Sequence, residues 1–461
     1  MSGAAGKLLR GVLPADRVRD DRATRLVHEC DGLRLFRELP DAVAYPLDTN
    51  EVAACVGALA RAGIPIVARG AGTGLAGGAR PCQGGVLLDL AKMDRVLALE
   101  PSARTARVQA GVVKLRVSEA AAPHGLFFAP DPSSQSACTI GGNVACGSGG
   151  PHCLRHGTMT DHVAAVALVD AEGTVHETDD ECVLSLLVGS EGTLGIVTEA
   201  TLRLLPLPAA TATLLLPFAR MQEACEAVQA ILAEGLLPAA LEILDRRAVA
   251  AVEDSVFAAG YPRDAGAVLL VELEGFREEV EEALEWIAAR WPLRRAVDEA
   301  ERARFWKGRK GAFGAMGRLA EECYVMDCVV PRSRMGEAVG AIDAAAERRG
   351  LTLVHVFHAG DGNLHPLLAH RRDEAGLVEA AGKEIAEICL RAGGSLTGEH
   401  GIGVEKRDLM PLLFDPPSLR AMERVREAFD PRRILNPGKL LPGPKACAEA
   451  LRREEAFRVL S

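Results

Sequence analysis

The chain has 461 residues, of which 48% are hydrophobic, so it can form two or three domains with substantial cores. Its formal net charge of −10 argues against a nucleic-acid partner, because such partners require a basic surface. An acidic chain that handles a small anion must concentrate arginine, histidine or a metal ion locally.

Neither a membrane span nor a targeting segment is expected. No stretch is long and apolar enough to cross a bilayer. The apolar patch at the N-terminus is interrupted by Arg10 and Pro14, unlike a signal peptide. The 12 cysteines are scattered without a CxxC pair, so they offer no ligand set for an iron–sulfur centre or a structural zinc ion. We therefore expect reduced thiols in a cytoplasmic protein.

The first elements are a lead-in and a helix. Residues 1–40 are expected to form a charged, helical lead-in. A helix is then predicted from Glu51 to Ala62, with Thr49-Asn50 as its cap and Gly63 at its end.

A glycine-rich loop follows a short buried strand at residues 64–67. In PIVARGAGTGLAGGA, glycines stand at positions 70, 72, 74, 77 and 78. So much glycine after a strand indicates positive φ angles or close approach of another group to the backbone. Consecutive N–H groups in such a loop form an anion-binding concavity, with Arg69 at its entrance. The loop predicts a pyrophosphate site, although a single loop of this kind equally fits a tight connection between strands.

Two further glycine-rich loops, at 130–150 and 189–206, repeat this chemistry in the first half of the chain. Three glycine clusters with Ser, Thr and Asn between them suit a long phosphate-bearing cofactor that lies across several loops. The spacing departs from the dinucleotide-binding fingerprint, since no GxGxxG opens a helix ahead of a strand carrying an acidic residue. A nicotinamide-binding domain is therefore the weaker interpretation.

The remaining pattern predicts two parts, separated by Pro206 and Pro208. In the first part we expect strands at 86–90, 106–111 and 164–170 and a helix at 113–122. In the second part we expect an antiparallel sheet with helices on one face. Its helices are predicted at 219–234, 276–290 and 332–349, and its strands at 268–274, 323–330 and 351–358.

The stretch VHVFHAGDGNLHPLL is predicted to be a β-hairpin with Asp361-Gly362 as its two-residue turn. In that register paired residue numbers sum to 723, so His358 lies directly opposite His365 with Cβ atoms roughly 4.5–5.5 Å apart. Two imidazoles placed in this way can chelate one metal ion, whereas His355 falls on the other face. A polar hairpin whose histidines bond to the backbone is the alternative interpretation.

The segment TGEHGIG presents Glu399 and His400 between Gly398 and Gly401. Neighbouring side chains in extended backbone point apart, so one of the two can ligate a metal and the other can act as a base. Two histidines and a glutamate with an open position suit a catalytic Zn²⁺ ion, and Mn²⁺ or Fe²⁺ accept the same ligand types.

Seven motifs in order carry a resemblance to a known family: ARGAGTGLAGGA, FFAPDPSS, TIGGNVA, LLVGSEGTLGIVTEATLRLLP, HAGDGNLHP, GGSLTGEHGIG and FDPRRILNPGKLL. They resemble the FAD-linked D-2-hydroxyacid dehydrogenases, which belong to the vanillyl-alcohol oxidase and p-cresol methylhydroxylase flavoprotein superfamily. RFWKGRKGAFGAMGR and CYVMDCVVPRSRM are similar to the branch that holds the FAD subunits of glycolate oxidases. The likeness runs from about residue 41 to residue 441.

The resemblance implies an α+β fold in which a p-cresol-methylhydroxylase-type FAD-binding domain precedes an α+β cap domain with an antiparallel sheet. The expected parts are the lead-in at 1–40, the FAD-binding domain at 41–207, the substrate-binding cap with the metal site at 208–429, and a segment at 430–461 that returns to the FAD domain.

The resemblance also assigns roles to residues. It puts His358, His365 and Glu399 on a divalent metal ion, with zinc favoured, and makes His400 the proton acceptor. It points to Arg309 for the substrate carboxylate, which a planar guanidinium grips better than an ammonium does. The FAD contacts it implies come from the three loops and the C-terminal segment: Arg69, Gly70, Gly72, Thr73, Gly74, Leu75, Pro130, Asp131, Ser134, Thr139, Gly141, Gly142, Asn143, Gly149, Gly192, Gly195, Ile196, Val197 and Asn436.

The implied reaction is oxidation of a 2-hydroxyacid to the 2-oxoacid, with hydride transfer from C2 to the flavin. Relatives that oxidise hydroxyglutarate carry a polar residue where this chain has Leu367, and a lysine within the stretch that reads CYVMD here. Both differences favour a small substrate such as glycolate or D-lactate. Electrons would leave to an iron–sulfur subunit, a quinone or a soluble carrier. Such partners allow peripheral membrane association, and a homodimer and a hetero-oligomer are both compatible.

One departure from the family lies between AEGTVHETDD and LLVGSEGTLG, where this chain is shorter than its relatives. The missing segment lies close to the cofactor in the family. It leaves an alternative open: a catalytically weak FAD-binding scaffold subunit of a multi-subunit glycolate oxidase complex. Retention of His358, His365, Glu399, His400 and Arg309 favours the enzyme, because a scaffold has no use for all five.

Overall fold

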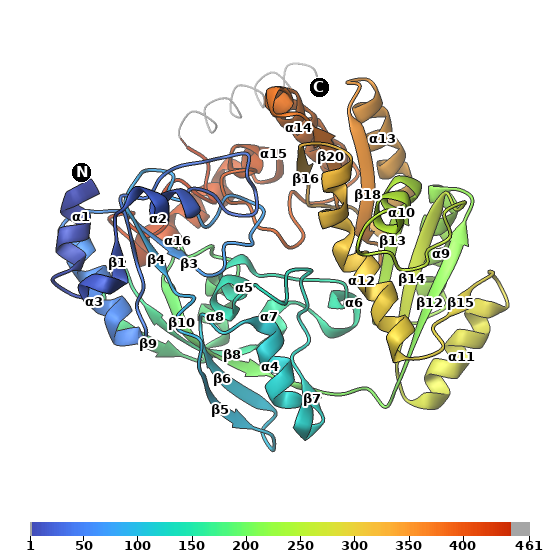
Figure 1. Ribbon diagram of the computed structural model, residues 1–461, viewed down its shortest axis with the longest axis horizontal. Helices are drawn as coiled ribbons and strands as arrows, with labels where there is room; N and C mark the ends of the chain where they lie inside the picture. The colour runs from blue at the N-terminus through green and yellow to red at the C-terminus, as the bar shows by residue number, and fades with distance from the viewer. Residues whose placement is uncertain (1, 444–461) are drawn as a thin grey trace. The chain divides into compact units, whose positions relative to one another are not determined.

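The computed structural model describes residues 2–443 and divides into two compact units. Among the described residues, the first unit takes 2–148, 158–206 and 399–443, and the second takes 149–157 and 207–398. Figure 1 shows the chain coloured along its length. Among residues 2–443, no helix is both long enough and apolar enough to cross a membrane.

The first unit contains a four-stranded and a five-stranded sheet. The four-stranded sheet has the order β1 (Val18–Arg19), β2 (Ala42–Ala44), β4 (Val86–Asp89), β3 (Ile66–Arg69), and its last three strands are parallel. The antiparallel five-stranded sheet has the order β5 (Val96–Glu100), β6 (Thr105–Gln109), β10 (Ile196–Arg203), β8 (Val163–Val169), β9 (Val175–Thr178). A small pair joins β7 (Leu126–Phe127) to β11 (Leu205–Pro206).

The helices of the first unit are short, apart from two. They are α1 (Ser2–Leu9), α2 (Arg22–Val27), α3 (Thr49–Arg61), α4 (Lys114–Ala121), α5 (Ile140–Cys146), α7 (Met159–His162), α8 (Glu181–Leu187), α15 (Met410–Leu413) and α16 (Pro416–Phe429).

Helix α3 packs between the two sheets. Its buried Val52, Val56 and Leu59 share one core with strands of both sheets, and each such side chain contributes about 1.5–3 kcal/mol when fully buried. The helix begins two residues earlier than predicted, at Thr49 instead of Glu51. Asp48 is the N-cap, and its side chain accepts a hydrogen bond from the backbone N–H of Glu51, so the predicted Thr49-Asn50 cap is wrong.

Both ends of the chain build the first unit. Helix α1 buries Leu9 in the α3 core, and β1 pairs with β2, so the lead-in is structural rather than peripheral. Near the other end, the N–H of Ile66 in β3 donates to Ile434 O over 2.7 Å. The chain re-enters this unit at Glu399, earlier than residue 430, because α16 packs Phe429 against the core of the five-stranded sheet. Residues 444–461 of the expected returning segment lie outside the described residues.

The second unit is a nine-stranded sheet, antiparallel throughout its described pairings. Its order is β15 (Arg294–Arg295), β12 (Ala210–Phe218), β14 (Ala267–Gly275), β13 (Ala240–Asp245), β18 (Thr352–His358), β19 (Asn363–Leu364), β17 (Cys328–Val329), with β20 (Pro366–His370) pairing both β18 and β16 (Glu322–Val325). The strand predicted at 323–330 is therefore two strands, interrupted at Met326 and Asp327.

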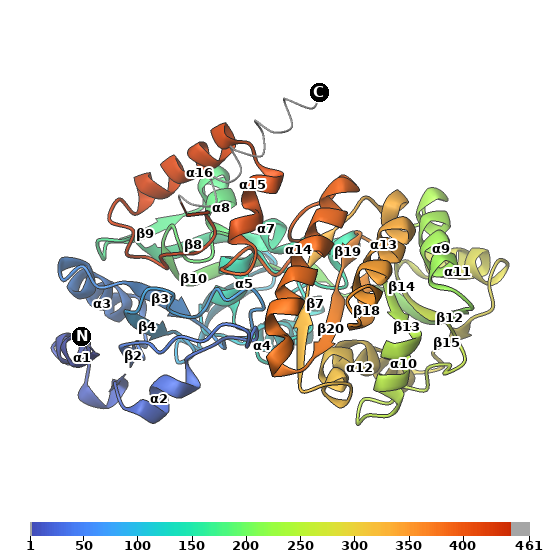
Figure 2. The same cartoon turned by 90° about the horizontal axis from the view of Figure 1, so that it is seen from above.

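Helices cover both faces of this sheet, so the prediction of helices on one face is wrong. They are α6 (Cys153–His156), α9 (Met221–Ala233), α10 (Arg246–Glu253), α11 (Arg277–Ala288), α12 (Glu299–Ala315), α13 (Met335–Glu347) and α14 (Ala375–Arg391). On β18, His358 points to Arg309 of α12, whereas His355, three residues earlier, bonds to Asp343 of α13. Figure 2 shows α10 and α12 on one side of the strands and α9, α11 and α13 on the other.

The hairpin that carries the two histidines has a different register from the predicted one. His358 pairs with Asn363, and His355 with Pro366, so paired numbers sum to 721 rather than 723. The connection is longer than the predicted two-residue turn at Asp361-Gly362. Because side chains alternate with a period of two, a slip of two residues keeps His358 and His365 on the same face.

Candidate functional site

The three glycine-rich loops meet in the first unit. A side-chain carbon on Gly70 in the first loop would collide with Thr139 Oγ1 in the second. The backbone N–H of Glu191 in the third loop donates to Ala145 O of α5 over 2.7 Å. Three loops that are far apart in sequence therefore contact one another, as a site for a long cofactor requires.

Arg69 braces the first loop from inside. Its Nη1 donates to Cys30 O at 2.7 Å and to Ala79 O at 3.3 Å. Gly72 has φ of 68°, and a side-chain carbon there would collide with the Arg69 guanidinium. Gly72 thus makes room for Arg69 rather than directly for an anion, and the loop needs glycine at this position for conformation and space.

Two residues near the C-terminus tie the first and third loops together. Asn436 Nδ2 donates to Gly78 O at 3.1 Å and to Glu191 O at 2.6 Å. Lys439 Nζ donates to Gly78 O at 2.8 Å and also bonds Arg80 O and Asn436 Oδ1. Burial lowers the pKa of Lys439 to about 8. Sequence reasoning missed Lys439, although a lysine in the apolar context ILNPGKLL was a usable signal.

The second loop offers polar atoms that suit a cofactor. Thr139 Oγ1, Asn143 Nδ2 and Ser148 Oγ are buried without a hydrogen-bond partner among the described residues. Such orphaned groups are rare, because each costs the desolvation free energy of an unmade bond. In the third loop, a side-chain carbon at Gly192 would meet no atom within 4 Å. These features fit a bound FAD. Ser148 was not among the residues expected at the cofactor, but its buried hydroxyl has the same character as Thr139 and Asn143.

The other residues expected at the cofactor occupy several positions. Thr73, Gly74 and Leu75 are half-buried in the first loop, Pro130 and Asp131 are buried, Ser134 is half-buried, and Gly141 and Gly142 form the first turn of α5. Ile196 and Val197 are buried in hydrophobic cores at the start of β10, just after Gly195. Gly149 falls in the second unit.

In the second unit, His358 and His365 form a close pair. Their ring centroids are 5.0 Å apart with the planes at 86°, and both residues are more than nine-tenths buried. His358 Nδ1 lies 2.8 and 2.9 Å from the two oxygens of Glu242. A carboxylate can only accept here, so the ring proton lies on Nδ1. The neutral imidazole then carries its lone pair on Nε2, the ring atom that can ligate a metal ion.

Arg309 belongs to the same buried cluster. Its Nη2 pairs with Glu242 at 2.6 Å and lies 3.3 Å from His358 Nδ1. Its Nε has no hydrogen-bond partner among the described residues, although it is buried. The guanidinium therefore keeps a donor for an anionic ligand. Lys310, by contrast, places its Nζ 5.4 Å from the centre of the Trp306 ring, in a cation–π contact.

Glu242 is a second residue that sequence reasoning missed. It lies on β13, is fully buried, and joins Arg309 to His358. An acidic residue on the inward face of the apolar strand ALEILD was the available signal, since buried carboxylates are paired or functional.

Glu399 and His400 lie in the first unit. His400 Nε2 is 3.7 Å from Glu399 Oε1, so the expectation that these neighbouring side chains point apart is wrong. The segment from 398 to 402 forms neither helix nor strand, and its bends bring the two side chains together.

A second buried acidic residue, Glu272 on β14, is fully satisfied by the protein. Arg302 donates to both oxygens at 3.0 and 2.8 Å, Trp306 Nε1 donates at 2.6 Å, and His152 Nε2 lies 3.1 Å away. Burial alone would raise the pKa of Glu272, but the bonds from His152 and Arg302 hold it well below its usual range. The saturated carboxylate indicates a structural role.

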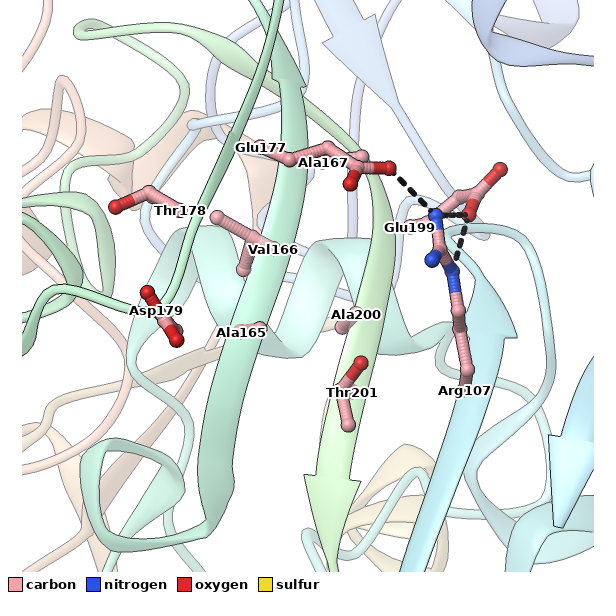
Figure 3. A pocket seen from close by; sticks show the side chains of 10 residues that line it. All are labelled: Arg107, Ala165, Val166, Ala167, Glu177, Thr178, Asp179, Glu199, Ala200 and Thr201. Atoms are coloured by element: carbon pink, nitrogen blue, oxygen red, sulfur yellow. Dashed lines mark hydrogen bonds and ion pairs between the residues drawn. The ribbon is translucent and has the colours of Figure 1, made fainter.

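A groove on the outer face of the five-stranded sheet lacks this chemistry. Figure 3 shows Arg107 reaching Glu177 and Glu199 across a floor that includes Ala165 and Ala167. The guanidinium bonds the two carboxylates at 2.7 and 2.8 Å, so its charge is already compensated. The groove is therefore not the functional site.

Together, the fold and the loop surface define the class of protein. The fold is similar to that of p-cresol methylhydroxylase, in a crystal structure with substrate bound. The two structures superpose with a TM-score of 0.79 at 16% identity, and the match covers 95% of this chain and 96% of the other. The expected α+β fold class, with its large antiparallel sheet, is confirmed.

Family comparisons agree along most of the chain. The family described as FAD binding domain matches residues 40–179, and the family described as FAD linked oxidases, C-terminal domain, matches residues 207–440. The chain is 42% identical to glycolate oxidase subunit GlcD of Escherichia coli K12, over 92% of this chain and 88% of that protein. It is 34% identical to D-lactate dehydrogenase of Archaeoglobus fulgidus, over 87% of this chain and 91% of that protein. The chain belongs to the FAD-linked oxidase family and is an FAD-linked oxidoreductase.

Proposed function

We propose that this oxidoreductase oxidises a small D-2-hydroxyacid, glycolate or D-lactate, to the 2-oxoacid. Relatives named glycolate oxidase subunit and D-lactate dehydrogenase support the substrate class. The observation that carries the proposal is the buried cluster of Arg309, Glu242 and His358, beside His365. It combines an unsatisfied guanidinium donor with an imidazole pair on one face of the sheet.

We assign cofactor binding to the three loops and metal binding to His358, His365 and Glu399. When bound, FAD would take a hydride from C2 of the substrate, and a divalent metal ion, with zinc favoured, would lower the pKa of the 2-hydroxyl. The hydrogen bond between His358 Nδ1 and Glu242 supports the assignment of His358 as a ligand, because metal-ligating histidines usually donate their other ring N–H to a carboxylate or carbonyl.

Chain connectivity supports Glu399 as the third ligand. Asn363 is the strand partner of His358, and a side-chain carbon on Gly398 would lie 2.5 Å from the Asn363 amide. Glu399 follows Gly398 directly, and consecutive Cα atoms are about 3.8 Å apart. Glu399 therefore follows a residue that contacts the side chain of Asn363 on β19, the strand that pairs with β18 at His358.

The chain's own residues then divide the work. Arg309 holds the substrate carboxylate through its uncommitted Nε edge. His400 takes the proton of the 2-hydroxyl as a general base. Glu242 holds both Arg309 and the His358 ring in place.

A small substrate is supported by the apolar residues near the histidine pair. Leu367 follows His365 by two residues, so both lie on the same face, and Leu367 is 3% exposed within the core beside α10 and α12. Neither Leu367 nor its buried strand partner Val325 can bind a second carboxylate.

Electrons must pass to an acceptor outside the chain, and the relative named as a glycolate oxidase subunit supports a partner polypeptide. An iron–sulfur subunit is one class of acceptor that we propose. A quinone or a soluble carrier is the other class of acceptor. Every cysteine among residues 2–443 is free, which supports a cytoplasmic setting.

Anaerobic bleaching of the flavin tests the proposal. The purified protein should lose its yellow absorbance with glycolate or D-lactate and keep it with L-lactate. Retained colour with both acids would refute the activity and favour a scaffold subunit of a glycolate oxidase complex.

A further inference from the structure

The carboxylate of Asp327 holds the chain just before Glu399. Asp327 is fully buried between β16 and β17. Both of its oxygens accept from the backbone N–H of Gly398 at 3.1 Å, and Thr397 Oγ1 donates to one of them. The same carboxylate lies 3.9 Å from His365 Nδ1. One buried acidic residue in the second unit thus contacts a proposed metal ligand and the segment that leads to the next.

The carboxylate of Glu191 holds the chain just after His400. Within the first unit, its Oε1 accepts from the N–H of Ile402 at 2.7 Å and from that of Gly403 at 2.9 Å. Gly401 has φ of 85°, and a side-chain carbon there would lie 2.8 Å from Glu191 Oε1. Glycine at 401 therefore lets the carboxylate approach the backbone.

Glu191 is itself held from two sides. Its N–H donates to Ala145 O, and its carbonyl accepts from Asn436 Nδ2 at 2.6 Å. The backbone of Glu191 is therefore fixed by the second loop and by Asn436, and its side chain starts from a fixed position.

The two carboxylates bracket the point at which the chain passes from one unit to the other. The second unit ends at Gly398, and the first resumes at Glu399. Only Glu399, His400 and Gly401 separate the two anchored stretches, and no helix or strand orders them. Hydrogen bonds to charged acceptors are worth roughly twice neutral ones, so these contacts can fix a segment that lacks a backbone ladder.

We propose that Asp327 and Glu191 are positioning residues that hold Glu399 and His400 from opposite ends of this three-residue segment. The inference rests on the proposed function, since it assigns the segment a ligand and a base. Asp327 lies on the Glu399 side and governs retention of the metal ion. Glu191 lies on the His400 side and governs proton removal.

Conservative variants separate the two effects. Asp327→Asn keeps the shape and one acceptor oxygen, and we expect a 10–100-fold loss of metal affinity, typical of a group that orients a ligand, with FAD retained. Glu191→Gln should keep the metal ion and leave KM within about threefold, while flavin reduction slows 10–100-fold. The alanine variants, which lose both oxygens, should be more severe.

Amide hydrogen exchange provides a readout that does not depend on the substrate. The amides of residues 398, 402 and 403 should exchange faster in the variants than in wild type. Asp343→Asn and Glu199→Gln remove carboxylates from the same two units without touching the segment, and both should behave as wild type.

Each outcome decides the matter. Unchanged exchange at these amides in the variants overturns the inference. Faster exchange with unaltered metal content and flavin reduction also overturns it, because Asp327 and Glu191 would then have a purely structural role. Wild-type protein that binds no metal and is not bleached refutes the proposed function instead, and the exchange rates then decide the anchoring alone.

Discussion

His358 donates its Nδ1 proton to Glu242, whose carboxylate lies 2.8 Å away and also pairs with Arg309. A single buried anion on β13 therefore orients a proposed metal ligand and a proposed substrate clamp. Removing its charge should disturb both functions at once.

Glu242→Gln tests this coupling. The neutral amide has one acceptor oxygen in place of two, and Arg309 would be left with an uncompensated buried charge. We expect metal affinity to fall 10–100-fold and flavin reduction to slow by a similar factor. Metal analysis and anaerobic stopped-flow absorbance measure the two, with His365→Ala as the metal-free reference and exposed Glu281→Gln as the neutral control. Full metal content with normal reduction would contradict the role given to Glu242.

Arg309→Lys separates charge from geometry. Lysine keeps the positive charge but loses the planar fork, so KM for the hydroxyacid should rise strongly, and kcat should fall where alignment for hydride transfer suffers. Steady-state kinetics measure both constants. Lys310→Ala, which removes the neighbouring cation, should leave KM near wild type. An unchanged KM in Arg309→Lys would place the carboxylate elsewhere.

His400→Gln addresses proton removal. The variant should bind substrate and metal, yet its flavin should reduce roughly 10²–10⁴-fold more slowly, the usual contribution of a general base. A metal ion alone supports some ionisation of the hydroxyl, so the residual rate should recover as pH rises. Stopped-flow bleaching at several pH values measures this recovery. Wild-type rates in the variant would show that another group is the base.

Gly72→Val tests the glycine loop. The branched side chain is strained at φ of 68° and collides with Arg69, which holds the loop to Cys30 and Ala79. The protein should purify without FAD, as its absorbance at flavin wavelengths reports. Gly317→Ala, where the added carbon meets no atom within 4 Å, is the control and should keep its FAD. A yellow Gly72→Val protein would remove this loop from the cofactor site.

Glu272 predicts a pH dependence of stability. Its pKa is depressed in the folded state, so its stabilising effect is complete above the ordinary value of 4.5 and is lost as pH falls below it. At pH 7, Glu272→Gln should lower the stability of the second unit by about 3–5 kcal/mol, because it leaves buried Arg302 without its partner. Thermal unfolding from pH 7 to pH 3.5 should show the difference from wild type shrinking with acidity. A constant difference would contradict the depressed pKa.

The sequence by itself determined the local features. Glycine runs after apolar strands marked all three loops, because only glycine tolerates the required backbone angles and close approaches. The family motifs predicted the FAD-linked class, and the family comparisons confirm it. The sequence also predicted which face of the hairpin each histidine lies on. An error of two residues in register left both histidines on the predicted face, since side chains alternate with a period of two.

Tertiary structure alone decided the partners of the functional groups. Glu242 is 116 residues from His358, and Asn436 is 245 residues from Glu191, so no local periodicity could pair them. Local periodicity also could not predict that helices cover both faces of the large sheet. These arrangements arise because a buried charge must find a partner wherever the folded chain supplies one, and sequence distance does not limit that choice.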